Sequence, residues 1–271
     1  MRTLIRFFGL TYLLSWASFI GVALISPRSP AAGVRYPIYL LGVFGPAIVA
    51  VVLTAKAGGR AAVRELLGQM LRWRVRVRWY VFAISYMAGI KLLVALIYRL
   101  ATGAWPRFGH DPWYLILLAI ALSTPVQAGE EIGWRGYALP RLAARWDLAR
   151  ASIILGIIWA CWHLPLFFIQ GIDKSGQSFP VYLLQVTSLS IAAAWLYWRT
   201  RASLLLVMLM HSAVNQTLGI VPSTVPGAAN VFGFSTSSVA WLTVGLLWVG
   251  AALFLVQMRV PSLPEHLREP G

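Results

Sequence analysis

Two adjacent glutamates, Glu130 and Glu131, lie inside an apolar segment of this 271-residue chain. One charged side chain at the centre of a membrane-spanning helix costs about 2.5–3.5 kcal/mol, so carboxylates that remain in such a segment usually serve a function. Arg135 follows Glu131 by four residues, a spacing that suits an ion pair on one helix face. The sequence therefore predicts that Arg135 neutralises Glu131 and leaves Glu130 free for chemistry.

Two histidines and an asparagine extend this set, because they also lie in apolar segments. His163 is in one segment and His211 in another, and Asn215 follows His211 by four residues on the same helix face. A buried carboxylate beside an imidazole can activate water as a general base. Side-chain donors such as His211 and Asn215 can stabilise the oxyanion that forms. These residue types predict hydrolysis of an acyl bond, above all a peptide bond, without a covalent intermediate.

The same atoms have a competing use as metal ligands. Two histidines and one glutamate form a known catalytic zinc set, which here would be Glu130, His163 and His211. The chain has no His-Glu-x-x-His helix, so the residue types leave open whether the site holds zinc or no metal. The single cysteine, Cys161, lies two residues before His163 and is expected to point away from it and to pack.

The elements that position these residues must be membrane helices. Hydrophobic residues make up 59% of the chain, charged residues only 11%, and the mean hydropathy is +0.73, whereas an ordinary soluble domain is about 25% charged. A soluble globule and a disordered chain are both excluded. We expect an all-α, polytopic membrane protein in which residues 1–271 form one transmembrane domain with its motif-bearing core at 113–221. The eight predicted spans are 4–26, 36–55, 79–100, 113–134, 152–170, 179–198, 203–221 and 239–258.

The basic residues predict how the chain is oriented. With the N-terminus inside, seventeen Lys and Arg residues fall in inner loops, four in outer loops and two within a span. Because Lys and Arg collect on the cytoplasmic side, this split places both termini in the cytoplasm, as in a prokaryotic cell membrane. It also explains the net charge of +15 without nucleic acid as a partner. The connector at 56–78 resembles an interfacial amphipathic helix that contacts lipid headgroups.

The depths of the chemical residues can be estimated from the helical rise. Glu130 lies about 6–8 Å inside the inner end of its span, His211 about 12 Å and His163 about 16 Å. Pro125 and Pro165 interrupt two of the helices, and freed backbone groups are tolerated only around a cavity or a packed interior. The prediction is a polar chamber, surrounded by about eight helices, that opens to the cytoplasm.

Three motifs resemble those of the CPBP family, the CAAX proteases and bacteriocin-processing enzymes also called the Abi family. Residues 130–137, with Pro140 and Leu142 after them, are similar to its Glu-Glu-x-x-x-Arg motif. Residues 159–165 are similar to its Phe-x-x-x-His motif, and residues 211–215 to its His-x-x-x-Asn/Asp motif. The family includes the eukaryotic Ras-converting prenyl-protein endopeptidase. The three motifs occur in order, each in an apolar segment, and together cover about a third of the chain.

The resemblance implies an eight-helix intramembrane endopeptidase. By analogy, Glu130 activates water with His163, while His211 and Asn215 stabilise the oxyanion. The family has been described both as metalloendopeptidases and as metal-free glutamate proteases, so it does not decide between zinc and no cofactor. One departure from the pattern is Trp159, where the motif has Phe. We expect this change to alter packing beside His163 without removing chemistry.

The resemblance does not define the substrate. Eukaryotic members cut prenylated C-terminal tripeptides, but many prokaryotic relatives act on other peptides or have no known substrate, so the partner is expected to be a peptide or membrane protein in the bilayer. The alternative function is a non-catalytic binding protein, either a bacteriocin-immunity or scaffold protein or a transporter. A transporter more often has repeated halves, which this sequence lacks.

Overall fold

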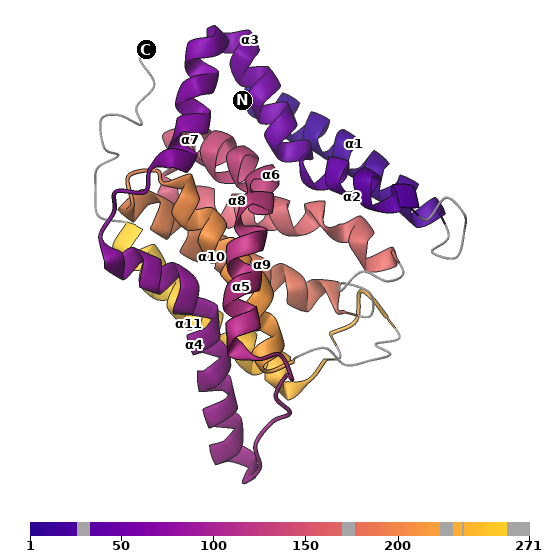
Figure 1. Ribbon diagram of the computed structural model, residues 1–271, viewed down its shortest axis with the longest axis vertical. Coiled ribbons are helices and arrows are strands. Elements are labelled where there is room, and N and C mark those ends of the chain that lie inside the picture. Colours follow the sequence, from indigo (N-terminus) through magenta and orange to yellow (C-terminus); the bar gives the residue numbers. More distant parts are fainter. Residues whose placement is uncertain (26–32, 170–176, 223–229, 235, 259–271) are drawn as a thin grey trace.

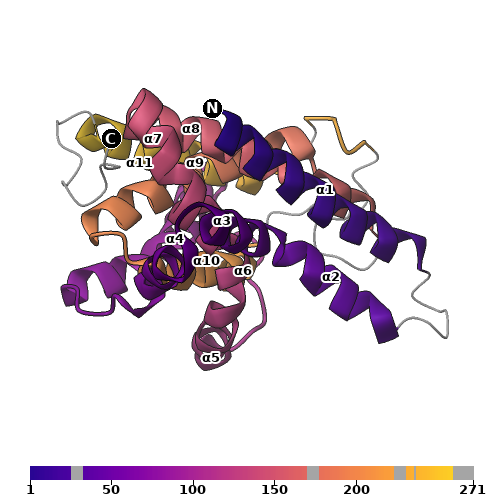
Figure 2. The ribbon, with the colours of Figure 1, turned by 90° about the horizontal axis from the view of Figure 1, so that it is seen from above.

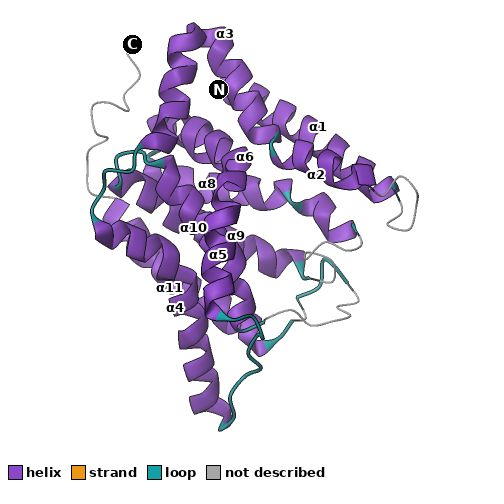
Figure 3. Ribbon diagram, in the orientation of Figure 1, coloured by secondary structure: helices purple, strands orange, loops and turns teal. Residues whose placement is uncertain are grey.

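The computed structural model describes residues 1–25, 33–169, 177–222, 230–234 and 236–258. These residues form helices joined by loops and contain no strand, which confirms the predicted all-α fold (Figure 3). The helices are α1 (Arg2–Leu24), α2 (Arg35–Val43), α3 (Gly45–Gly68), α4 (Val77–Thr102), α5 (Trp113–Ser123), α6 (Ala128–Glu131), α7 (Leu139–Trp146), α8 (Leu148–Trp162), α9 (Phe179–Arg199), α10 (Leu204–Thr217) and α11 (Ser238–Met258).

Among the described residues, seven helical segments are long and apolar enough to cross a membrane. Each corresponds to one predicted span, so the chain is a polytopic membrane protein as expected. The remaining predicted span, 203–221, is the shorter apolar segment Leu204–Ile220, which consists of α10 and a 3₁₀ turn. The sequence therefore located eight apolar helical segments, of which seven have the length of a full span.

The predicted span 36–55 is not one straight helix. It is divided at Phe44 into α2 and α3, because Pro46 has no backbone N–H to continue the ladder of the preceding helix. A second break occurs at Gly59, whose φ of +66° is unfavourable for other residues. The chain reverses direction there, so that α3 forms a bent hairpin in Figure 1. The half that follows Gly59 corresponds to the predicted amphipathic helix, and its Leu66 is buried.

The segment that carries the two glutamates is the most irregular part of the fold. A 3₁₀ turn (Thr124–Gln127) that contains Pro125 separates α5 from the short α6. The next element, η4 (Ile132–Ala138), is a π-helix and leads into α7. π-Helical turns are rare and often mark functional sites. The irregular backbone lies directly beside Glu130 and Glu131, as expected of a segment that bounds a site.

The centre of the molecule is formed by α8, α9 and α10 (Figure 1). Gly156 lets α8 approach α9 closely, since a Cβ at this position would lie 2.8 Å from the Cα of Thr187. On one side α1 packs against α2 and α3, and on the other α10 packs against α4 and α5. Helix α5 lies at the edge of the assembly (Figure 2) and buries only Ile120, so most of its apolar surface faces outward, as suits contact with lipid.

An aromatic cluster connects α1 to the two segments that carry the first and second motifs. Trp134 of η4 and Trp162 of α8 meet edge to face with ring centroids 5.8 Å apart. Phe7 contacts Trp134, and Phe19 contacts Trp162. The indole N–H of Trp16 also donates to the backbone carbonyl of Trp162 at 3.0 Å. These contacts fix the relative positions of η4 and α8.

Gly133 provides the close contact between η4 and α3. A Cβ at Gly133 would lie 2.6 Å from both the carbonyl carbon and the carbonyl oxygen of Pro46, which cannot move without displacing the backbone. The absence of a side chain at Gly133 therefore determines how near η4, and the glutamates before it, lie to the bend between α2 and α3.

We predict that Gly133→Ala destabilises the protein by about 1–3 kcal/mol, because it overpacks this contact. Thermal unfolding in detergent measures the change as a lower Tm. Gly89→Ala is the matched control, since a Cβ at the exposed Gly89 of α4 meets nothing within 4 Å. Equal unfolding temperatures for the two variants would contradict this account of the contact.

Candidate active site

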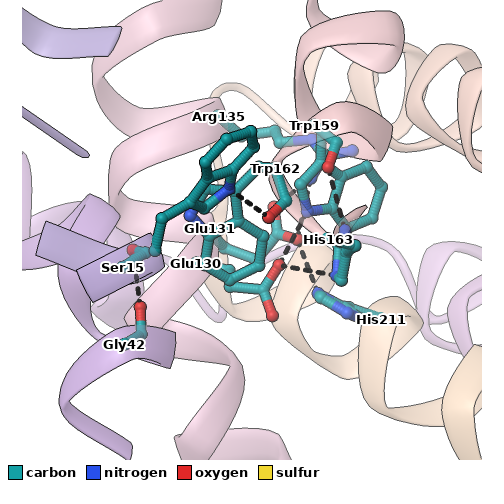
Figure 4. A network of polar contacts seen from close by, with 10 residues as sticks. Ser15, Gly42, Glu130, Glu131, Arg135, Trp159, Trp162, His163 and His211 are labelled. Atoms are coloured by element: carbon teal, nitrogen blue, oxygen red, sulfur yellow. Dashed lines mark hydrogen bonds and ion pairs between the residues drawn. The ribbon is translucent and has the colours of Figure 1, made fainter. Parts of the chain in front are cut away.

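Glu131 is completely buried, and cationic or hydrogen-bonding partners surround its carboxylate. Nη1 of Arg135 donates to both carboxylate oxygens, at 2.9 and 3.1 Å. Nδ1 of His211 lies 2.7 Å from Oε1 (Figure 4). The ion pair predicted from the four-residue spacing is therefore confirmed. The contact with His211, on α10, was not predicted, because the sequence does not show which helices lie side by side.

Arg135 has a second contact, with the aromatic ring of Trp159. The guanidinium carbon lies 4.1 Å from the ring centroid, a distance typical of a cation–π interaction. Nε and Nη2 of Arg135 have no hydrogen-bond partner among the described residues, and the side chain is fully buried. The ring of Trp159 therefore provides part of the stabilisation that water would give to an exposed guanidinium.

Glu130 has a different environment, although it is adjacent in sequence. Its Oε2 accepts a hydrogen bond of 2.6 Å from the indole N–H of Trp159. Nε2 of His163 lies 3.9 Å from the same oxygen, which is too long for a direct hydrogen bond. The sequence did not predict this uncharged donor, which holds one oxygen of Glu130. No arginine is paired with Glu130 among the described ion pairs.

His163 is oriented by its own helix. Its Nδ1 lies 2.8 Å from the backbone carbonyl of Trp159, one turn earlier. Because a carbonyl can only accept, Nδ1 carries the proton, and Nε2 of the neutral ring then presents a lone pair on the side of Glu130. Pro165 lies just after His163, where α8 ends and a 3₁₀ turn begins. The histidine therefore occupies the end of α8 and not its middle.

The predicted catalytic residues line one cavity of about 330 Å³. Glu130, His163, His211 and Asn215 are all in its wall, whereas Glu131 and Arg135 lie behind it. Asn215 is exposed and follows His211 by one turn of α10. The structure thus brings together the residues that the sequence selected, from α6, α8 and α10. It also separates those predicted to act from those predicted to support them.

The cavity is also lined by apolar and aromatic side chains. They include Tyr39, Val43, Leu166, Tyr182, Val186 and Leu189. The volume lies within the range of small-molecule and peptide side-chain pockets, which are usually apolar with a few converging polar groups. The arrangement suits an apolar ligand group held beside a reactive carboxylate.

The side chains of the alternative metal set, Glu130, His163 and His211, are not arranged as a metal site. Among the described residues, no three His, Cys, Asp or Glu side chains are grouped so that they could hold a metal ion. Glu130, His163 and His211 line one cavity but do not form such a group. In both histidines Nδ1 is occupied by another contact, with the Trp159 carbonyl in one and the Glu131 carboxylate in the other.

Comparisons with known proteins agree with the three motifs. The family model described as type II CAAX prenyl endopeptidase Rce1-like matches residues 111–217, the region that contains α5 to α10. CAAX prenyl protease 2 of Methanococcus maripaludis is 25% identical over 225 residues, which cover 77% of this chain and 81% of the relative. Both descriptions are those of proteases. The predicted resemblance to CAAX prenyl endopeptidases is confirmed.

We predict that Arg135→Met lowers the free energy of unfolding by about 3–5 kcal/mol, because it leaves Glu131 buried without its cation. Arg135→Lys should cost less, since it keeps the charge but loses the planar group over Trp159. Thermal unfolding in detergent gives the comparison. Arg145→Met, at an exposed position of α7, is the matched control. An Arg135→Met protein with the Tm of Arg145→Met would show that the ion pair does not stabilise the fold.

Proposed function

We propose that this chain is an intramembrane endopeptidase that hydrolyses a peptide bond with water activated by Glu130 and His163. The observation that carries the proposal is the pairing of these two side chains in the wall of one cavity, 3.9 Å apart. That separation exceeds a hydrogen bond but allows one water molecule to contact both atoms. The similarity to CAAX prenyl endopeptidases supports the same reaction.

In the proposed reaction, the carboxylate of Glu130 takes a proton from water while His163 orients that water through Nε2. The hydroxide adds to the carbonyl carbon of the peptide. The proton then passes from Glu130 to the peptide nitrogen as the C–N bond breaks. Glu131 cannot perform this step, because its carboxylate already accepts from Arg135 and His211.

His211 and Asn215 are the proposed donors to the oxyanion, since both line the cavity next to Glu130. The amide of Asn215 can donate in its ordinary state. His211 can donate from Nε2 only in its doubly protonated form, because the hydrogen on Nδ1 is directed at Glu131. Oxyanion donors that are held in place before the reaction typically contribute about 10²–10³ in kcat.

The proposed substrate is a peptide or membrane protein that enters the cavity from the cytoplasmic leaflet. A prenylated CAAX peptide is the first one to test, because the M. maripaludis relative is named for that activity and apolar side chains line part of the cavity. The excess of basic residues in the inner loops supports the same orientation, with both termini in the cytoplasm.

We predict that Glu130→Gln and His163→Ala each lower kcat for such a peptide by about 10²–10⁴-fold, the usual contribution of a general base. Cleavage is measured with purified protein in detergent, and peptidomics of the membrane detects other substrates. Arg145→Met should keep wild-type turnover. Cleavage products that persist with Glu130→Gln would exclude the proposed mechanism. An intact, folded wild type that cuts no peptide in either assay would favour the binding-protein alternative.

The same assay distinguishes a metal-free reaction from a zinc-dependent one. Turnover that is unchanged by a strong chelator is the result expected if Glu130 and His163 activate water by themselves. Turnover that is lost with chelator and restored by Zn²⁺ would instead assign Glu130, His163 and His211 as ligands.

A further inference from the structure

Trp159 contacts four of the polar residues at the site, although it does not contact Glu131. Its indole N–H donates to Glu130, and its backbone carbonyl accepts from His163. Its ring lies under the guanidinium of Arg135. The ring of His211 meets it edge to face, with centroids 5.2 Å apart at an angle of 83°. One buried side chain on α8 therefore joins residues from α6, η4 and α10 (Figure 4).

The hydrogen bond to Glu130 restricts what that carboxylate can do. A short N–H···O bond of 2.6 Å holds Oε2 in one place and therefore fixes the rotation of the carboxylate plane. The Arg135 guanidinium lies over the face of the same ring. A cation there draws electron density from the indole, so the N–H is a stronger donor. The hydrogen bonds of Arg135 are made to Glu131.

Trp159 also determines the separation between Glu130 and His163. The carbonyl that fixes Nδ1 of His163 and the indole that fixes Oε2 of Glu130 belong to the same residue. The two groups that lie 3.9 Å apart, Nε2 of His163 and Oε2 of Glu130, therefore belong to side chains that the same residue holds. A phenylalanine ring at this position would keep the backbone carbonyl but would leave Oε2 without its donor.

We propose that Trp159 is a positioning residue, whose indole N–H holds the carboxylate of Glu130 at the separation from His163 that one water molecule bridges. This rests on the proposed function only for its effect on turnover, because the hydrogen bond itself exists without substrate. Trp159 acts through Glu130 and takes no part in bond making. Glu130 and His163, by contrast, contact the reacting water in the proposed reaction.

The first test is kinetic and uses Trp159→Phe, which keeps an aromatic ring and removes the N–H. We expect kcat for the cleaved peptide to fall about 10–100-fold with KM within about twofold, because the lost contact orients the base and does not bind substrate. Trp134→Phe is the matched control: Trp134 is also buried, its indole N–H has no partner among the described residues, and it does not line the cavity. It should retain wild-type kcat and KM.

The second test needs no substrate. In protein labelled with ¹⁵N-tryptophan, the indole resonance missing from Trp159→Phe identifies Trp159 among the 13 tryptophans. A strong hydrogen bond to a carboxylate should move this resonance downfield, and Glu130→Gln should move it back upfield. The Trp134 resonance should not respond. This test remains falsifiable if Trp159→Phe is too unstable to purify, because a spectrum in which none of the 13 indole resonances responds to Glu130→Gln would still overturn the proposal.

The outcomes separate this proposal from the proposed function. A Trp159 indole resonance whose chemical shift does not change in Glu130→Gln would overturn the positioning role. Unchanged kcat and KM in Trp159→Phe would also overturn it. A raised KM with unchanged kcat would instead show that Trp159 contacts substrate, and an equal loss in Trp134→Phe would show a general packing effect. Full turnover in Glu130→Gln would defeat the proposed mechanism even where the resonance responds.

Discussion

The site depends on one buried interaction, the ion pair between Glu131 and Arg135. His211 adds a hydrogen bond to the same carboxylate. Two adjacent carboxylates repel each other, and in an apolar interior each also loses its hydration. The protein resolves this by treating them differently: Glu131 accepts from a guanidinium and an imidazole, whereas Glu130 accepts from a neutral indole. One glutamate is thereby made part of the scaffold, and the other remains in the cavity wall.

The irregular backbone around the glutamates lies where α6, α8 and α10 come together at the site. The π-helix η4 carries Arg135 one turn after Glu131, and Gly133 allows that turn to pack directly on the backbone of Pro46. On the other side, α8 ends at His163, so this side chain lies at the cavity and not within the helix ladder. Aromatic contacts between Trp134 and Trp162 then fix η4 relative to α8.

Much of this was predictable from the sequence, and the exceptions have a common cause. The spans, the ion pair of Glu131 and four polar residues of the cavity (Glu130, His163, His211 and Asn215) follow from local patterns. These patterns are apolar runs, a four-residue spacing and polar residues within apolar segments. Contacts between distant segments do not. The bond from Trp159 to Glu130 joins residues 29 positions apart, and the sequence marked Trp159 only as a packing change.

The central claim is that Glu131 stabilises the fold and Glu130 does not. It is tested most directly by the unfolding temperatures of Glu130→Gln and Glu131→Gln in detergent. The substitutions are chemically identical and one residue apart. The account predicts that Glu131→Gln lowers the Tm strongly, because it leaves the buried Arg135 without its counter-ion, whereas Glu130→Gln leaves the Tm close to that of the wild type. Equal losses, or a larger loss for Glu130→Gln, would contradict the claim that Glu131 is structural and Glu130 is not.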